Sequence, residues 1–516
     1  MKKAVKKAHP KGEKLPTEMG QLSNKVAVDT YAGRVHIDWD ETARVTPFGQ
    51  LAFFIEFLKR TELFDEFVKN CPLELTSPNA PETRDVLGTI LLSVLAGHTR
   101  YSHMTALRAD KVSAELLGMT KTASEDSVRR SLEKIPPDLG RTWQRNALKN
   151  CYLELLDAPW ILDVDTTVKC LYGHQEGAVK GYNPTKPGRP SHNYHSYMIA
   201  NLRMILDVEV MAGNESSSNK TIPYLFSLLD ELPIGKRPTF VRGDCNFGTD
   251  AVMHECEVRQ QPYLFKLKQT TNIKRFISKK MLESEWENAG QGWYGCEGEL
   301  KLMGWKQSRR VIILRRKLKK EFGVLTKKAA SGQIEFNFAT VNGDVEPYEY
   351  AALVTNSTDE IMTIAAHYRD RADSENNFDE LKNQWGWCGF TTQDLHRCRL
   401  MARIIALVYN WWLIFARLIE PNKHLEAKTS RPLMLHAVGK VIEHAGQTII
   451  QVSSSHAKFK KIQAALASTS AFFKTLRSCA EQLDIAERMR RVLRRAFRKF
   501  FDAMRRHPPN LLPAPA

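Results

Sequence analysis

Four residues near position 375 have the types and the spacing of a site that handles phosphate. Tyr368, Arg371, Glu375 and Lys382 stand at offsets 0, 3, 7 and 14 in IMTIAAHYRDRADSENNFDELKNQ, a segment without Gly or Pro that predicts a helix. On a helix these offsets lie within about 60° of one another, so a carboxylate, two cations and a phenol share one stripe. One acid among hydrogen-bond donors suits metal-assisted chemistry on a phosphate. The plainer alternative is a solvated helix face held by i,i+3 and i,i+4 pairs.

Two strand-like segments supply further carboxylates. In ILDVDTT, Asp163 and Asp165 are two positions apart, which puts both on one face of a strand. In RGDCNFG, Asp244 stands where a second strand runs into a turn, and ligand groups of open α/β sheets collect at the carboxyl ends of strands. With Glu375 as a third acid, these oxygens suit Mg²⁺ or Mn²⁺ rather than zinc, and two such ions can serve phosphodiester displacement.

Each of these acids also has a purely structural interpretation. An aspartate of the DxD strand can cap a turn or pair with an arginine, and Asp244 beside Gly243 can be only a turn former. The order acid–acid–acid on strand, strand and helix, together with a basic stripe on that helix, favours the catalytic interpretation.

The charge of the chain points to a polyanionic partner. The 516 residues carry a formal net charge of +17, and the cations cluster in MKKAVKKAHPKGEK, SRRVIILRRKLKK and ERMRRVLRRAFRKFFDAMRRH. Because the clusters are spread along the whole chain, nucleic acid is favoured over a membrane surface. For any single cluster, a solvated face or tail remains an alternative.

The cysteines and the apolar segments indicate a cytoplasmic protein without a membrane span. The nine cysteines form no CxxC pair, which is typical of a reducing compartment, and no apolar stretch follows the basic N-terminus as it would in a signal peptide. The most apolar segment, IIALVYNWWLIFA at 404–416, is too short to span a bilayer and predicts a buried core helix.

Periodicity divides the chain into helical ends and a mixed α/β centre. A helix–turn–helix in the N-terminal third, with Thr122 and Glu125 as a capping box and Pro136 ending the second helix, is compatible with DNA recognition through Arg129 and Arg130, although ordinary helical domains share this spacing. Three strands and then alternating helices and strands predict a mixed sheet flanked by helices. The predicted regions are a basic tail (1–45), a helical DNA-binding domain (46–155), the first part of the sheet domain (156–269), a β-rich insertion (270–345), its second part (346–420) and a basic helical C-terminal region (421–516).

The chain resembles bacterial DDE transposases of the insertion-sequence-four superfamily. That group has the signature Tyr-(2)-Arg-(3)-Glu-(6)-Lys, which Tyr368, Arg371, Glu375 and Lys382 match residue for residue. Asp165-Thr166-Thr167 matches the motif of the first acid, the Asp244 of VRGDCNFG matches that of the second, and QEGAVKGYNP resembles the loop after the first acid. The resemblance covers about residues 155–420.

The resemblance implies an RNase H-like catalytic domain and assigns roles to its residues. Asp165, Asp244 and Glu375 would be the metal ligands, with Asp163 in reserve because it faces the same way. The resemblance further implies that Tyr368, Arg371 and Lys382 contact DNA phosphates or the flipped transposon end. In relatives, a tryptophan of the insertion stacks on a flipped base; Trp293 or Trp305 could serve, although for each the core residue is the favoured interpretation.

These observations predict a cut-and-paste transposase associated with the nucleoid. It would use Mg²⁺, or Mn²⁺ in its place, to cleave double-stranded DNA at terminal inverted repeats, form hairpins and join the freed 3′-hydroxyl to target DNA, acting as a homodimer. The alternatives are a metal-dependent nuclease of the same fold, which would not rejoin strands, and a transposase-derived DNA-binding regulator, which would tolerate loss of an acid. A basic structural protein would need none of these motifs.

Overall fold

A computed structural model describes residues 25–40, 42–184, 186–215, 218–283, 285–317, 348–453, 456–478 and 483–506, without the side chains of residues 372–376 and of a few other helical positions. The chain divides into two compact units, Met1–Arg44 and Val45–Ala516. This division falls beside the predicted end of the basic tail at residue 45. The other predicted domain boundaries lie inside the second unit and stay predictions.

The first unit contains a β-hairpin where the sequence analysis expected a tail with little fixed structure. Strands β1 (Val26–Thr30) and β2 (Gly33–Ile37) pair antiparallel, with Val26 opposite Ile37. Gly33, at φ 108°, supplies the left-handed backbone that the tight turn needs. The short alternation VAVDT…GRVHI was the signal, and the surrounding basic residues masked it. Residues 1–24 lie outside the described part of the chain.

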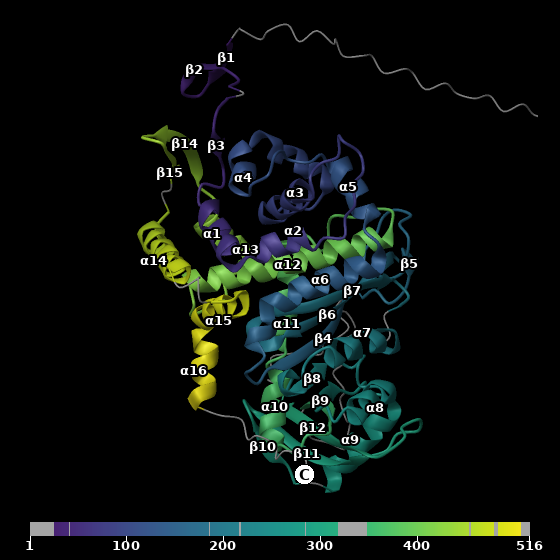
Figure 1. Cartoon of the computed structure of the whole chain (residues 1–516). Helices are drawn as coiled ribbons and strands as arrows, with labels where there is room; N and C mark the ends of the chain where they lie inside the picture. Colours follow the sequence, from purple (N-terminus) through teal and green to yellow (C-terminus); the bar gives the residue numbers. More distant parts are fainter. Residues whose placement is uncertain are drawn as a thin grey trace, which may run out of the picture. The chain divides into compact units, whose positions relative to one another are not determined.

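The centre of the second unit is a large mixed sheet (Figure 1). Strands β4 and β6 pair antiparallel, as do β6 and β7, whereas β4, β8 and β9 run parallel to one another. Every strand that the sequence predicted between residues 158 and 270 is present. Their bounds are β4 (Ile161–Cys170), β6 (Pro190–Ile199), β7 (Met204–Ala212), β8 (Phe240–Gly243) and β9 (Tyr263–Lys266), with the short β5 (Val179–Lys180) on the edge of β6.

The segment predicted as a β-rich insertion extends this same sheet. Its strands β10 (Glu287–Gly290), β11 (Trp293–Leu300) and β12 (Arg309–Lys317) continue antiparallel from β13 (Tyr348–Thr355), which pairs with β9. The segment begins with helix α9 (Thr271–Glu283), where the sequence analysis expected strands. Its apolar residues recur at helical intervals, a signal that the aromatic and basic composition of the following strands obscured. Residues 318–347 lie outside the described part.

Helices cover both faces of the sheet, and alternate strand residues point to each. Phe240 of β8 and Leu264 of β9 pack with helix α10 (Ile361–Arg369), whereas the next residues along, Val241 and Phe265, belong to the core on the opposite face. That opposite face is flanked by α7 (Ser218–Asp230), α8 (Asp250–Val258) and α9 (Figure 1). The predicted fold class, a mixed α/β sheet flanked by helices, is confirmed.

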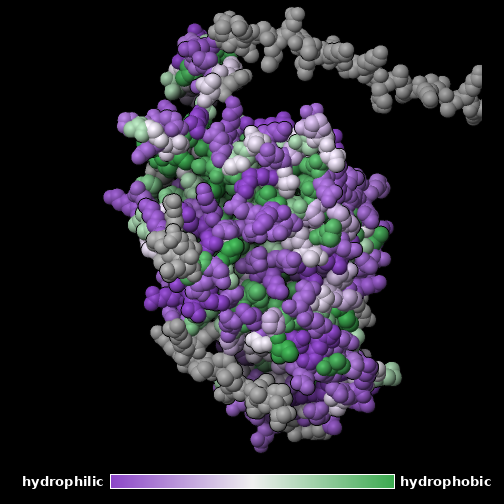
Figure 2. Space-filling view, in the orientation of Figure 1, coloured by the Kyte–Doolittle hydropathy of each residue, from purple (hydrophilic) through white to green (hydrophobic). Residues whose placement is uncertain are grey.

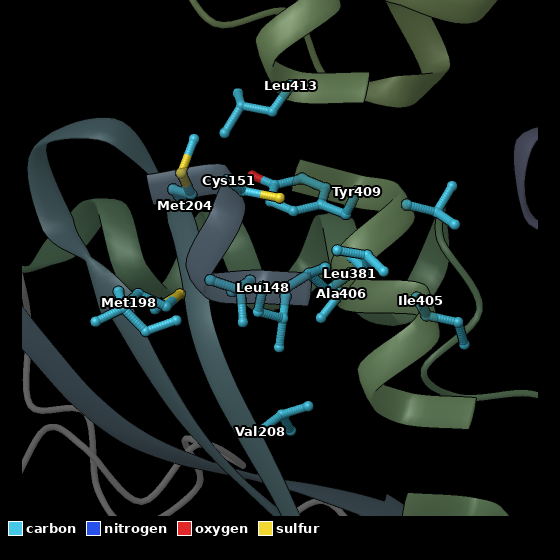
Figure 3. Packing of buried hydrophobic residues seen from close by; sticks show 14 of the residues in the cluster. Leu148, Cys151, Met198, Met204, Val208, Leu381, Ile405, Ala406, Tyr409 and Leu413 are labelled. Carbon is cyan, nitrogen blue, oxygen red and sulfur yellow. The ribbon is translucent and has the colours of Figure 1, made fainter. Parts of the chain in front are cut away.

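Helix α12 (Leu395–Ile419) is the central element of the core. It packs against β7 and α6 (Pro137–Tyr152), and Figure 3 shows Leu148 of α6, Val208 of β7, and Ile405 and Tyr409 of α12 around one apolar space. Among the described helices it alone has the length and composition to cross a membrane, but 94% of its apolar window is buried within the protein. The face of the molecule in Figure 2 is mostly hydrophilic. The prediction of a core helix at 404–416 is confirmed.

The N-terminal helices begin and end close to the predicted positions, with one correction. Helix α5 begins at Glu125 and is capped by Ser124, whose hydroxyl accepts a hydrogen bond from the Ser127 amide, so Thr122 is not the cap. Ser124 is the N-cap because its side chain lies directly before the first helical turn, whereas Thr122 is two residues further away. The helices of this region are α1 (Leu51–Thr61), α2 (Leu63–Lys69), α3 (Thr83–Leu95), α4 (Lys111–Leu116) and α5 (Glu125–Lys134).

The C-terminal region was predicted to be helical throughout, but it also contains a β-hairpin. Between helices α13 (Ala427–Met434) and α14 (Phe459–Ser478), strands β14 (Val438–His444) and β15 (Gln447–Ser453) form a hairpin, and β14 also pairs with β3 (Val45–Thr46). The turn residues Ala445 and Gly446 both have positive φ, which suits a two-residue hairpin loop. The β-branched residues around this Ala-Gly pair were the missed signal. Helices α15 (Ile485–Ala496) and α16 (Arg498–Arg506) follow.

Candidate active site

Two of the predicted acids lie side by side where β8 ends beside the middle of β4. Val164 of β4 is paired with Gly243, the last residue of β8, so Asp165 and Asp244, which follow them, lie on neighbouring segments about 5 Å apart. Asp165 is 7% exposed. Burial raises the pKa of Asp165 to about 7, Arg371 opposes the rise, and the nearby Asp244 adds to it. Two carboxylates that disfavour each other's charge are typical of a site that takes a cation or a proton.

Asp244 is both a turn residue and a member of this pair, so the two interpretations of the sequence are compatible. Its carboxylate accepts a hydrogen bond from the Asn246 amide at 2.9 Å and another from the Asn246 side chain at 3.2 Å. Burial raises the pKa of Asp244, which Arg371 opposes. The turn therefore holds the carboxylate at the end of β8 and leaves it close to Asp165.

The predicted stripe faces these acids, although its segment is two helices instead of one. Helix α10 ends at Arg369 and α11 (Ala372–Asn383) follows, with Arg371 at its N-cap in helical backbone geometry. Arg371 forms an ion pair with Asp165. Burial raises the pKa of Tyr368 to about 12, with Arg371 opposing and Asp244 contributing to the rise, so the phenol stays protonated near the carboxylates.

The structure describes the backbone of Glu375 in α11 but not its side chain. It lies in the first turns of α11, four residues after Arg371, which is about one helical turn further along the same side. Among the described side chains no group of three or more His, Cys, Asp or Glu residues could hold a metal ion. The two carboxylates Asp165 and Asp244 fit the donor chemistry of Mg²⁺ or Mn²⁺, which binds through a few carboxylates and completes its shell with water and phosphate.

The same face of β4 continues the site beyond Asp165. Two residues on, Thr167 accepts a hydrogen bond from Lys382 of α11 at 3.2 Å between Nζ and Oγ1. Two further on, the buried Lys169 donates to the carbonyl of Gly389, in the loop after α11. Sequence reasoning missed Lys169, although its place in the alternation Asp165-x-Thr167-x-Lys169 was the available signal. Burial lowers the pKa of this lysine.

Asp163, the reserve metal ligand, belongs to a buried ion pair. Arg242 of β8 donates to both of its oxygens, at 2.5 and 2.7 Å, and both side chains are almost fully buried. Arg242 also donates to the carbonyl of His367 at the end of α10. Both oxygens of Asp165 are engaged too, by the Thr166 amide and by Arg371. Asp165, however, lies beside Asp244 and shares Arg371 with it. This proximity to Asp244 favours Asp165 over Asp163 as the first ligand.

The remaining predicted DNA-binding residues lie away from the acids or line a cleft. Trp293 and Trp305 are partly buried and each has an arginine over its ring, Arg316 at 4.8 Å and Arg309 at 5.2 Å. No described contact joins either tryptophan to the acid pair. The stack on a flipped base therefore stays a prediction.

The two predicted DNA-binding arginines of α5 occupy exposed positions. Arg129 is partly exposed and pairs with Asp126, whereas Arg130 is exposed. Arg129 lines the same cleft as Lys382 of the stripe. The helix that was predicted to read DNA thus lines a cleft together with a residue of the stripe.

Comparison with known families agrees with this geometry. A family model described as "Transposase DDE domain group 1" matches residues 56–472, a range that includes both acids and the stripe. The chain belongs to this family. Membership in a DDE transposase family implies cleavage and joining of DNA strands with divalent metal ions.

A cryo-EM structure of a piggyBac transposase synaptic complex with hairpin DNA is similar, with 12% sequence identity and a TM-score of 0.38 over 92% of this chain and 88% of that chain. No curated protein matches the chain.

Proposed function

We propose that this protein is a cut-and-paste DNA transposase whose catalytic acids are Asp165, Asp244 and Glu375. The observation that carries the proposal is the placement of Asp165 and Asp244 next to each other, facing Arg371 and Tyr368. The antiparallel β7–β6–β4 meander, joined to parallel β8 and β9, supports the RNase H-like classification implied by the resemblance.

The chain's own groups would hold and neutralise the scissile phosphate. Asp165, Asp244 and Glu375 would hold one or two divalent cations, which when bound supply Lewis-acid polarisation of the phosphate and activation of the attacking oxygen. Arg371 would offset the charge that develops on the phosphoryl oxygens, because its guanidinium already lies against Asp165. The protonated phenol of Tyr368 and the ammonium of Lys382 would donate hydrogen bonds to neighbouring phosphate oxygens.

The finer parts of the proposal rest on the Tyr-Arg-Glu-Lys spacing. They are membership in the insertion-sequence-four superfamily, a bacterial and nucleoid-associated setting, and a synaptic homodimer. The proposed order of steps is hydrolysis at the element's end, hairpin formation by the freed 3′-hydroxyl, reopening of the hairpin and joining to target DNA. One acid site can serve every step because each is an in-line displacement at phosphorus.

The test is incubation of the protein with labelled duplex DNA from the ends of its own element, with Mg²⁺ or Mn²⁺. We expect nicks at the terminal base, hairpins and joined products on a denaturing gel, all absent with Asp244→Ala. Nicks without joined products would indicate a metal-dependent nuclease. Tight binding with no cleavage would indicate a regulator, and activity that survives Glu375→Ala would contradict the assignment of the third acid.

A further inference from the structure

Two adjacent polar clefts lie between helix α5 and the connection from α11 to α12. One has a volume of about 610 Å³ and is lined by Arg100, Arg129 and Lys382; the other has a volume of about 530 Å³ and is lined by Arg129, Arg130 and Arg397. Arg129 and Thr391 line both clefts, so the two are adjacent, and together we call them the α5 groove. In Figure 1, α5 lies beside the N-terminal end of α12, and the two helices are in contact.

The α5 groove has an excess of positive charge. Its lining includes five cations and two carboxylates, Glu125 and Asp126. Arg129 pairs with both carboxylates, at 3.6 Å from Glu125 and more closely with Asp126. Arg100 and Arg130 are exposed, and within the described part of the chain Arg100 forms no ion pair. Exposed guanidinium groups in a groove of this kind suit a chain of phosphates, because each presents several donors to oxygen atoms.

One end of the groove reaches the active site. Lys382 lines it and also donates to Thr167, which follows Asp165 by two residues on the same face of β4. Two residues along a strand are about 7 Å. A DNA strand that passes the acid pair would therefore meet Lys382 next and could continue toward Arg129 and Arg130.

The walls of the groove are fixed to each other, so the groove exists before DNA binds. The amide of Phe390 donates to the carbonyl of Thr99 at 2.7 Å, which joins the α11–α12 connection to the N-terminal helices. Gly389 packs so closely there that an added Cβ would lie 2.0 Å from the Thr99 carbonyl oxygen. Lys169 of β4 donates to the carbonyl of the same glycine.

We propose that the α5 groove binds consecutive phosphates of the DNA strand that leads to the acid pair. Its arginines thus set the register of the strand on the active site. This inference rests on the proposed function and adds to it a binding path for the substrate. The contacts are to the backbone and not to bases, so they act on any sequence.

The first test is the salt dependence of binding to a fluorescein-labelled duplex that carries the DNA flanking the protein's own gene. Arg100→Ala/Arg130→Ala is compared with the full-length protein and with Lys69→Ala, a control at an exposed lysine of α2 outside the groove. We expect the slope of log K against log salt concentration to become shallower by about 1 for each groove arginine removed, and to stay unchanged in the control. Equal slopes in all three proteins would overturn the proposal.

The second test locates the phosphates. Single uncharged methylphosphonate linkages are placed at successive positions of the strand beside the cleavage site. The natural protein should bind DNA more weakly when the methylphosphonate lies at any of a few consecutive positions on one side of that site. At the same positions the methylphosphonate should not weaken binding by the double variant, which already lacks the groove arginines. Equal sensitivity of both proteins at every position would overturn the groove as the binding path.

Failure of this inference and failure of the proposed function give different results. If the protein cleaves DNA but the slopes are equal, the groove is wrong and the catalytic assignment stands. If the protein cleaves nothing with either metal ion but the slopes differ as expected, the groove binds DNA in a protein that is not a transposase.

Discussion

Strands β4 and β7 carry the same pattern of two buried carboxylates, two residues apart, but the carboxylates differ in how many arginines pair with them. On β7, Arg403 of α12 pairs with both Asp207 and Glu209. Arg145 of α6 adds a second partner to Asp207 at 2.9 Å, and Arg141 lies 3.7 Å from Glu209. Arg145 also pairs with Glu231, so three arginines meet three acids, the charge is balanced, and the network joins the sheet to α6 and α12.

On β4 the balance changes within two residues. Asp163 has Arg242 to itself, whereas Asp165 and its neighbour Asp244 both depend on Arg371. Lys266 acts on Asp244 as a further cation, yet the pKa of both carboxylates is still raised, which is typical of a site that takes a cation or a proton. The comparison teaches that the spacing of acids on a strand does not by itself indicate a cation site; the two strands differ in how completely nearby cations offset their buried acids.

The largest expected effect is on the balanced strand. Arg403→Met leaves Asp207 and Glu209 buried with fewer partners, so we expect the free energy of unfolding to fall by about 3–5 kcal/mol. Chemical denaturation followed by circular dichroism measures it. The double variant Arg403→Met/Glu209→Gln removes one charge of each sign and leaves Asp207 paired with Arg145, so it should recover most of the loss. A single variant as stable as the natural protein would break the distinction between the two strands.

A smaller effect on stability, of opposite sign, is expected when Asp165 of the acid pair is neutralised. The folded-state pKa of Asp165 is raised to about 7 from a usual 3.8, so the folded protein binds more protons than the unfolded chain between these values. Without metal, its contribution to stability is therefore present at low pH and is lost as pH rises from about 4 to about 7. Asp165→Asn should remove this loss. Chemical denaturation in EDTA between pH 4 and 7 should then show an unfolding free energy that changes less with pH than that of the natural protein. A profile as steep as that of the natural protein would contradict it.

The smallest effect concerns the contact next to the acids. Lys382→Met removes the hydrogen bond to Thr167, and we expect a cost of about 0.5–1.5 kcal/mol in unfolding free energy. A double-mutant cycle with Thr167→Val isolates the contact, because both single variants lose the same bond. Additive effects of the two substitutions would show that Lys382 is not held on β4.

Local sequence patterns predicted most of the core elements and few of the exposed ones. Strands β4 and β6 to β9 and helix α12 have strong apolar periodicity, and each was found within a few residues of its predicted position, whereas the two-residue strand β5 was not predicted. The hairpins β1–β2 and β14–β15 were missed because most of their residues are exposed and carry little of that signal. Helix α9 was missed because its neighbours dominate the composition of the segment.

For the site, spacing along the chain predicted the acids and the stripe but not their partners. Arg371 and Lys382 contact β4, and Tyr368 lies near the acid pair, although the helical repeat counted in the sequence is divided between α10 and α11. The choice between Asp163 and Asp165 could not be made there, because Arg242 stands 79 residues from Asp163 and meets it only through the pairing of β4 with β8. The same holds for Arg403, which reaches β7 from α12, 196 residues from Asp207.

The most direct test of the account is Mn²⁺ binding by isothermal titration to three proteins: the natural chain, Asp165→Asn, and Asp163→Asn/Arg242→Gln. The double variant replaces the buried ion pair by a neutral one of similar shape, so the fold has no unpaired charge. We predict that Asp165→Asn weakens binding at least about 10-fold, while the double variant binds like the natural protein. Binding that survives Asp165→Asn but is lost in the double variant would contradict the assignment of the acid pair.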